Sequence, residues 1–158
     1  MTRQELLELL NDKGIEYEIT EHIPVFTIEE MLECNLPYPE IIAKNLFVRD
    51  DKKRNYYLIT VHEERKINLK DFQEQFGTRK LSFASENDLM NILGLIKGSV
   101  TPFGLLNDKE KKVQFYIGKE FMQGKLGVHP LENTATVWIR GKDLINLVKE
   151  HGNQIVEF

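Results

Sequence analysis

Two polar residues at the start of an apolar run are the first candidates for chemistry. Lys44 and Asn45 open a strand-like segment that is otherwise hydrophobic. A lysine at the mouth of a strand is able to direct its ammonium group into a cleft, where it attracts a phosphate or a carbonyl oxygen. The alternative is an edge lysine whose stem covers apolar surface while its charge stays in water. On this segment alone we favour the structural alternative.

Two further polar segments follow. In residues 98–104, glycines at both ends bracket Pro102, so the loop must bend and is able to present backbone N–H and C=O groups to a ligand. An ordinary connection between two elements is the favoured alternative. His129 precedes a proline, which holds it extended ahead of a polar turn. For His129, a role in a functional site and a purely structural role are evenly balanced.

Several common catalytic signatures are absent from the sequence. It contains neither a glycine-rich phosphate loop nor a Gly-x-Ser-x-Gly elbow. Cys34 is the only cysteine, and its helix-like setting indicates a packing role. The four histidines lack the spacing of zinc ligands. We therefore expect no metal and no cofactor.

Length and composition indicate an ordinary globular chain. The 158 residues are 41% hydrophobic and 29% charged, without repeats or linkers, so we expect a single domain spanning residues 1–158. No run approaches the ~20 apolar residues that span a bilayer, and the first residues do not form a secretion signal. We expect a cytoplasmic protein with no membrane partner. The net charge of −4 argues against a protein that binds along the length of a nucleic acid, but it permits one that binds only the end of such a molecule.

Capping signals and apolar periodicity predict where the elements lie. Helices are expected to begin after Thr2, Thr27, Asn68 and Ser85, and near Gly141. Strand-like runs occupy residues 17–21, 46–48, 56–61, 114–117, 134–139 and 154–158. Some of these strands follow one another directly, and others are separated by helices. The order predicts an α+β fold with a mixed sheet.

Four blocks in a fixed order carry a family resemblance that spans nearly the whole chain. They are Val25-Phe26-Thr27-Ile28-Glu29-Glu30, Lys44-Asn45-Leu46-Phe47-Val48-Arg49-Asp50, Gly98-Ser99-Val100-Thr101-Pro102-Phe103-Gly104, and Gly127-Val128-His129-Pro130 with Asn133-Thr134-Ala135-Thr136. The chain resembles the YbaK/prolyl-tRNA synthetase-associated editing family, and within it the free-standing alanyl-tRNA(Pro) deacylases of the ProX/PrdX kind. The resemblance implies a mixed, barrel-like β-sheet surrounded by helices. It also implies hydrolysis of the aminoacyl ester at the 3′ end of mischarged alanyl-tRNA(Pro).

The resemblance also implies roles for individual residues. Lys44 would hold the terminal phosphate or ribose, the loop from Gly98 would contact the α-amino group through its backbone, and His129 would shape the amino-acid pocket. The substrate's own 2′-hydroxyl would assist the attack. The implied catalytic residues are Lys44, Gly98 and His129; the implied substrate-binding residues are Phe26, Met31, Asn45, Ser99, Val100, Thr101 and Pro102; and Arg79 and Lys80 would read the acceptor stem.

An aminoacyl ester is already activated, so its hydrolysis requires little beyond a positioned water and a stabilised oxyanion. This requirement agrees with the absence of an obvious nucleophile. The implied partner is tRNA, with prolyl-tRNA synthetase as a second candidate partner. The alternatives left open are a deacylase for cysteinyl-tRNA(Pro) or another small aminoacyl-tRNA, a non-catalytic module that binds tRNA ends, and a small-molecule esterase.

Overall fold

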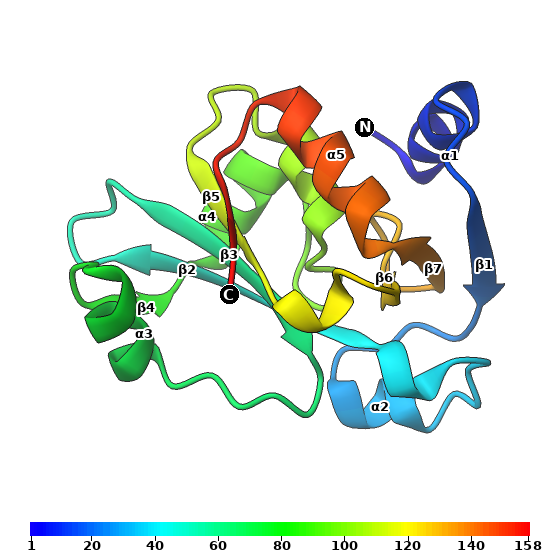
Figure 1. The fold of residues 1–158 in the computed structure, drawn as a ribbon, viewed down its shortest axis with the longest axis horizontal. Helices are drawn as coiled ribbons and strands as arrows, with labels where there is room; N and C mark the ends of the chain where they lie inside the picture. The colour runs from blue at the N-terminus through cyan, green and yellow to red at the C-terminus, as the bar shows by residue number, and fades with distance from the viewer.

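A computed structural model describes all 158 residues. The helices are α1 (Arg3–Asp12), α2 (Ile28–Leu32), α3 (Leu69–Phe76), α4 (Glu86–Asp88) and α5 (Gly141–His151), and the shorter 3-10 and π-helical turns are η1 (Pro39–Ile41), η2 (Leu89–Leu93), η3 (Pro102–Asn107) and η4 (Lys119–Phe121). The strands are β1 (Tyr17–Glu21), β2 (Ala43–Asp50), β3 (Tyr56–His62), β4 (Leu81–Phe83), β5 (Val113–Ile117), β6 (Lys125–Val128), β7 (Ala135–Arg140) and β8 (Ile155–Glu157) (Figure 1).

The predicted helix starts are confirmed, and all except that of α5 have a local side-chain cap. The Thr2 side chain accepts a hydrogen bond from the Glu5 N–H, and the Glu5 carboxylate accepts one from the Thr2 N–H, which completes a capping box. The Asn68 side chain accepts from the N–H groups of Lys70 and Asp71 at the start of α3. These bonds satisfy backbone donors that the first helical turn leaves without partners.

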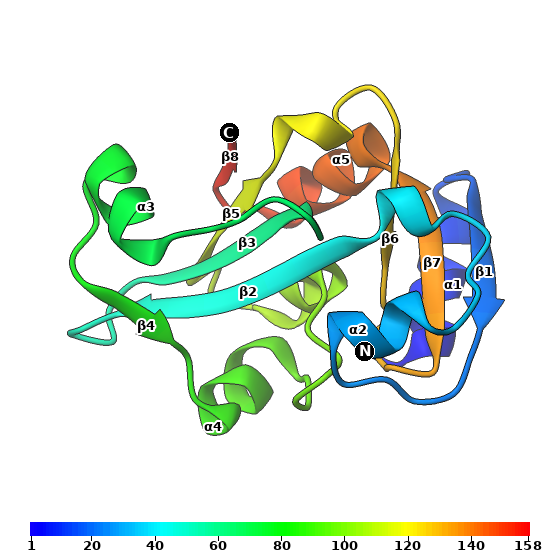
Figure 2. The same ribbon diagram turned by 90° about the horizontal axis from the view of Figure 1, so that it is seen from below.

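The strands form two sheets. One is mixed, with the order β4-β2-β3-β5-β8, and the other is antiparallel, with the order β1-β7-β6. The long strand β2 runs from the first sheet towards the second (Figure 2). A single bridge between Ile42 and Gly127 connects the sheet edges there. The mixed α+β architecture is confirmed, but the sheets do not close into the expected barrel, because this bridge is their only backbone pairing.

The five-stranded sheet has a packed core on each of its faces. Leu6 and Leu10 of α1, together with Leu144 of α5, lie in the main core at 0% exposure. On the other face, Phe72 of α3 packs on Tyr116. A third, smaller cluster gathers around the buried side chain of Trp138, and its buried members are Val25, Met31, Leu36, Ile42 and Trp138. This third cluster supports the region where the two sheets meet.

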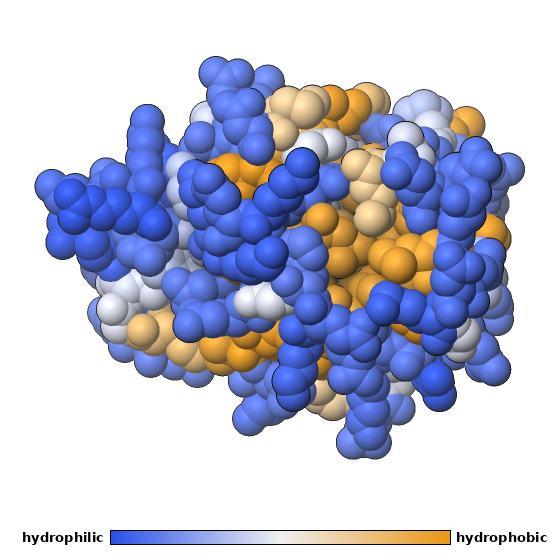
Figure 3. Space-filling view, turned by 90° about the horizontal axis from the view of Figure 1, so that it is seen from above, coloured by the Kyte–Doolittle hydropathy of each residue, from blue (hydrophilic) through white to orange (hydrophobic).

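The surface seen from above in Figure 3 is mainly hydrophilic, with hydrophobic atoms exposed in several patches, one of them right of centre. Most large apolar side chains are turned inward, and the exposed exceptions include Ile23, Phe26 and Ile96. None of the helices is both long enough and apolar enough to cross a membrane.

Candidate functional site

The edge of β2 is open where the two sheets meet. On one side, β2 pairs with β3 from Ala43 to Arg49. On its other side, β4 pairs only with Val48, Arg49 and Asp50, and Gly127 reaches only Ile42. The segment 44–46 therefore has no strand partner on that side. Unpaired N–H and C=O groups at such an edge are available to a ligand.

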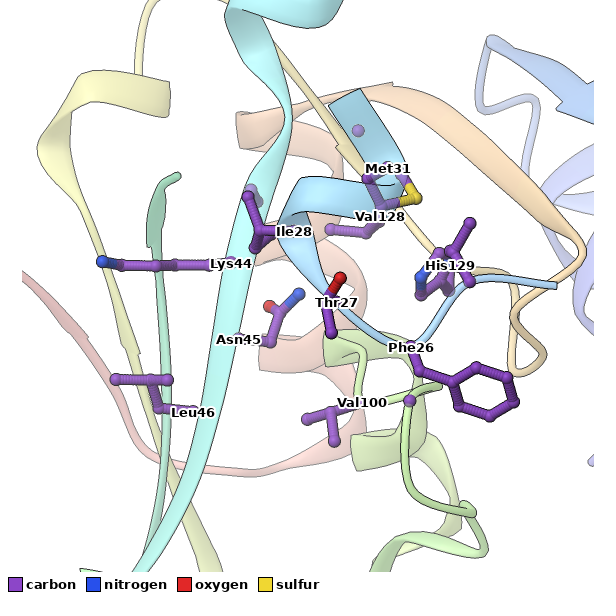
Figure 4. Close-up of a pocket in the computed structure, with 14 residues that line it drawn as sticks. Phe26, Thr27, Ile28, Met31, Lys44, Asn45, Leu46, Val100, Val128 and His129 are labelled. Carbon is purple, nitrogen blue, oxygen red and sulfur yellow. The ribbon is translucent and has the colours of Figure 1, made fainter. Parts of the chain in front are cut away.

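A cavity of about 260 Å³ lies against this open segment (Figure 4). Its lining is mainly apolar, and its volume is at the small end for ligand sites, which suits a small acyl group better than a large ligand. The residues that line it are Val25, Phe26, Thr27, Ile28, Met31, Ala43, Lys44, Asn45, Leu46, Gly98, Val100, Gly127, Val128 and His129.

Asn45 presents a hydrogen-bond donor to the cavity. Its Oδ1 accepts a 2.6 Å hydrogen bond from the hydroxyl of Thr60, which is fully buried. A side-chain amide has one acceptor oxygen and two N–H donors, so this bond fixes which end of the amide faces the cavity. Figure 4 shows the Asn45 nitrogen turned toward Thr27 on the cavity side. The arrangement is able to stabilise negative charge on a bound carbonyl oxygen.

His129 presents an acceptor to the same cavity. Its Nδ1 lies 2.9 Å from the carbonyl oxygen of Ala135, and because a carbonyl only accepts, Nδ1 carries the hydrogen. Burial lowers the pKa of His129, the bond to Ala135 raises it, and the nearby His22, with its ring centroid 5.9 Å away, lowers it again. The net pKa is below the ordinary value, so the ring is neutral at pH 7 and its Nε2 is free to accept a proton.

The loop that begins at Gly98 reaches the cavity mainly with its backbone. Gly98 has a φ of 89°, and a Cβ there would lie 2.6 Å from Cδ1 of Phe26, so the position requires glycine. Ser99 and Thr101 are fully buried, and their hydroxyls donate to the carbonyls of Ile96 and His129 at 2.8 and 2.6 Å. Three of the predicted binding residues, Ser99, Thr101 and Pro102, are buried and do not line the cavity, whereas Gly98 and Val100 do.

Phe26 and Met31 occupy opposite environments. Phe26 is 59% exposed, and in Figure 4 its ring extends away from the other labelled side chains, so it forms part of the rim. Met31 is 5% exposed and packs in the cluster around Trp138, so it forms part of the floor. Gly127 allows this floor to form, because a Cβ at that position would collide with the Trp138 ring.

The ammonium group of Lys44 is directed away from the cavity. Successive side chains of a strand point to opposite faces, so Lys44 lies opposite Asn45. Figure 4 shows the Lys44 side chain extended in the direction away from the cavity. Lys44 also lines a second pocket, together with Arg65 and Lys66. Its backbone therefore borders the first cavity while its charge faces the second pocket.

Arg79 and Lys80 do not line the cavity. Arg79 binds the Asp51 carboxylate through Nε at 2.6 Å and Nη2 at 3.0 Å. This bidentate contact raises the pKa of Arg79 and lowers that of Asp51. Asp51 follows the far end of β2, seven residues beyond Lys44, which corresponds to roughly 23 Å along a strand. A role for Arg79 and Lys80 would therefore concern a distant part of a large ligand.

The cavity also contains residues that were not predicted from the sequence as site residues. They include Thr27, Ile28, Leu46 and Val128. All four belong to the ordered sequence blocks, so the blocks themselves carried the signal. No group of three or more His, Cys, Asp or Glu side chains is arranged to hold a metal ion.

Comparisons with known proteins show the family and the fold of the chain. A family model described as an aminoacyl-tRNA editing domain matches residues 22–147. The chain is 42% identical to "Prolyl-tRNA editing protein ProX" of Acetoanaerobium sticklandii, across 96% of this chain and 93% of that protein. It is 37% identical to "Prolyl-tRNA synthetase associated domain-containing protein 1" of Mus musculus, across 96% and 92%. A crystal structure of a proposed trans-editing enzyme for prolyl tRNA synthetase shares the fold, with a TM-score of 0.70 at 18% identity and coverage of 98% and 94%.

Proposed function

The chain belongs to the aminoacyl-tRNA editing domain family, and on that premise we propose that it is a free-standing deacylase for mischarged alanyl-tRNA(Pro). Its editing class follows from the family and from the relative named as a prolyl-tRNA editing protein. The choice of alanine is supported by one observation above all. The cavity beside the open edge of β2 is small and apolar, and it combines the Asn45 donor with the His129 acceptor.

In this proposal the ester carbonyl lies beside Asn45. The Nδ2 donor of Asn45 and the unpaired backbone N–H of the same residue stabilise the oxyanion that forms when water attacks. The backbone at Gly98 contacts the α-amino group and helps to hold the attacking water. His129 accepts a hydrogen bond through Nε2 from the water or from the 2′-hydroxyl of the terminal ribose. Lys44 holds the phosphate of that nucleotide on the other side of the strand.

Selectivity for alanine would come from the walls of the cavity. Val100 and Val128 face the bound side chain, and Met31 supports the floor. An alanyl methyl group is small enough for such a pocket, whereas the ring of a prolyl group requires additional space. A pocket excludes a larger side chain by steric clash more strongly than it discriminates against a smaller one. The contacts that a smaller side chain loses supply only ~1–3 kcal/mol of discrimination for each missing methylene.

We further propose that residues 1–158 act as one editing domain. Leu6 and Leu10 of α1 are part of the main core, although α1 precedes the residues that the family model matches. At the other end, β8 pairs with β5 in the larger sheet. Both ends are thus built into the same packed structure as the cavity.

The test is deacylation of four charged tRNAs by the wild-type protein: alanyl-tRNA(Pro), prolyl-tRNA(Pro), cysteinyl-tRNA(Pro) and alanyl-tRNA(Ala). The proposal predicts fastest hydrolysis of alanyl-tRNA(Pro) and protection of prolyl-tRNA(Pro). Preference for the cysteinyl substrate would contradict the size argument alone. Binding of tRNA ends without any turnover would contradict the enzyme assignment.

A further inference from the structure

A second pocket lies on the face of β2 that Lys44 occupies. Its polar lining consists of Lys44, Arg65, Lys66, Asn68, Asp71 and Gln75. We propose that this pocket binds the phosphodiester backbone of the unpaired nucleotides that precede the aminoacylated adenosine. The inference rests on the proposed function, since it extends the path of the same substrate beyond the ester.

Lys44 is the one residue shared by the two pockets. Its backbone borders the aminoacyl cavity at the open edge of β2, and its side chain extends to the other face of the strand. When the aminoacyl ester at the 3′ end of a tRNA occupies the first cavity, the nucleotides that precede it must lie outside that cavity. The open edge of segment 44–46 is the place where this chain of nucleotides is able to cross β2. The first phosphate beyond the ribose would then meet the Lys44 ammonium.

Arg65 is held in a fixed position within the second pocket. Its Nη1 lies 2.8 Å from Oε1 of Glu120 and donates a 3.0 Å hydrogen bond to the carbonyl oxygen of Phe158. Its guanidinium carbon lies 4.2 Å from the centroid of the Phe158 ring. These three contacts restrain the side chain, so less conformational entropy remains to be lost when a phosphate binds.

The charge of the second pocket suits a phosphodiester. Lys44 and Lys66 form no ion pair within the protein, whereas Arg65 shares its charge with Glu120. Asp71 is the one acidic side chain in the lining. The ammonium groups of Lys44 and Lys66 are therefore the unpaired positive charges that a phosphate would meet in this pocket.

Asn68 adds a neutral donor to the pocket. Its Oδ1 accepts the N–H groups of Lys70 and Asp71, so its amide nitrogen remains available for a phosphate oxygen. Positively charged grooves with additional polar donors are typical of proteins that bind single-stranded nucleic acid without reading its sequence.

The experiment compares Lys66→Ala with wild type on two alanyl esters. One is 3′-O-alanyl-adenosine, which has no phosphate, and the other is the same ester at the end of a CCA trinucleotide. We expect the ratio of kcat/KM for the trinucleotide to that for the nucleoside to fall by at least about threefold in Lys66→Ala, through KM. The slope of log KM against log salt should become shallower by roughly one.

Lys112→Ala is the matched control, because Lys112 lies outside both pockets and pairs with Glu110 at 3.0 Å. It removes the same charge and should leave the ratio unchanged. Equal losses on both esters in Lys66→Ala, or no loss on either, would overturn the inference.

Binding of an uncharged CCA-ended RNA, followed by fluorescence anisotropy, separates this inference from the proposed function. We expect Lys66→Ala to weaken that binding even if the wild-type protein hydrolyses no ester. Unchanged RNA affinity in Lys66→Ala would reject the second pocket, whether or not deacylation is observed.

Discussion

The buried hydroxyl of Thr60 donates a 2.6 Å hydrogen bond to Oδ1 of Asn45, its direct partner across the β2–β3 ladder. This bond orients the amide so that its nitrogen faces the cavity. Thr60 is not itself one of the residues that line the cavity, so it is a positioning residue that acts through Asn45.

Replacing Thr60 by valine keeps the shape of the side chain and removes this bond. We expect kcat for alanyl-tRNA(Pro) to fall about tenfold with a smaller change in KM, because a loosened donor stabilises the transition state less well. Steady-state kinetics check this prediction. Thr60→Ser restores the hydroxyl and should recover most of kcat. A loss of equal size in the serine variant would show that packing, and not the hydrogen bond, is responsible.

A methyl group at Gly98 should disable the site. Gly98→Ala forces alanine into the left-handed region and places its Cβ 2.6 Å from Cδ1 of Phe26. Gly77→Ala is the matched control: its φ is also positive, at 67°, but its surroundings are open. Both variants should lose ~1–2 kcal/mol of folding stability, measured by urea unfolding. Only Gly98→Ala should also lose deacylation, and equal activity in the two variants would contradict the role of the loop.

Enlarging the cavity should relax its selectivity. Val100 lines the cavity and is only partly buried, so Val100→Ala creates space at modest cost to folding. We expect the ratio of kcat/KM for alanyl-tRNA(Pro) to that for prolyl-tRNA(Pro) to fall about tenfold or more. Both rates are measured by release of radiolabelled amino acid. An unchanged ratio would mean that another wall excludes proline.

The features that were predicted from the sequence are those set by local interactions. The cap of α1 at Thr2 and the cap of α3 at Asn68 each involve residues within three positions, so the pattern is visible in the sequence. The strands β4 and β6 were not predicted. β4 has only three residues, and β6 contains Gly127, which weakens the strand signal.

The open edge of β2 depends on pairing between distant segments, so it could not be predicted from the sequence. The partners of β2 at that edge, Phe83 and Gly127, lie far along the chain, and their limited reach creates the opening. The same pairing determines the face of β2 on which the Lys44 side chain lies. The family resemblance selected sequence blocks that the structure brings to one cavity, but it did not indicate that the Lys44 side chain points away from the cavity containing Asn45 and His129.

His129 should make folding stability depend on pH. Burial lowers its pKa in the folded state, whereas the unfolded chain has the ordinary value of about 6.5. The unfolded state therefore binds a proton first as pH falls, and the contribution of His129 to stability is complete above pH 6.5 and is lost below it. We expect the difference in stability between pH 7.5 and pH 5.5 to be smaller in His129→Gln than in wild type. Urea unfolding at the two pH values measures it, and equal differences would contradict the lowered pKa.

The most direct measurement maps where a non-hydrolysable substrate analogue binds. The analogue is 3′-alanylamino-3′-deoxyadenosine, in which an amide stands in place of the ester. Titration into isotope-labelled protein, followed by NMR, reports which residues it contacts. The account predicts that the largest shifts occur at Gly98, at the methyl groups of Val100 and Val128, and at the side-chain amide of Asn45. Shifts confined to other parts of the molecule would contradict the central claim that this cavity holds the alanyl group.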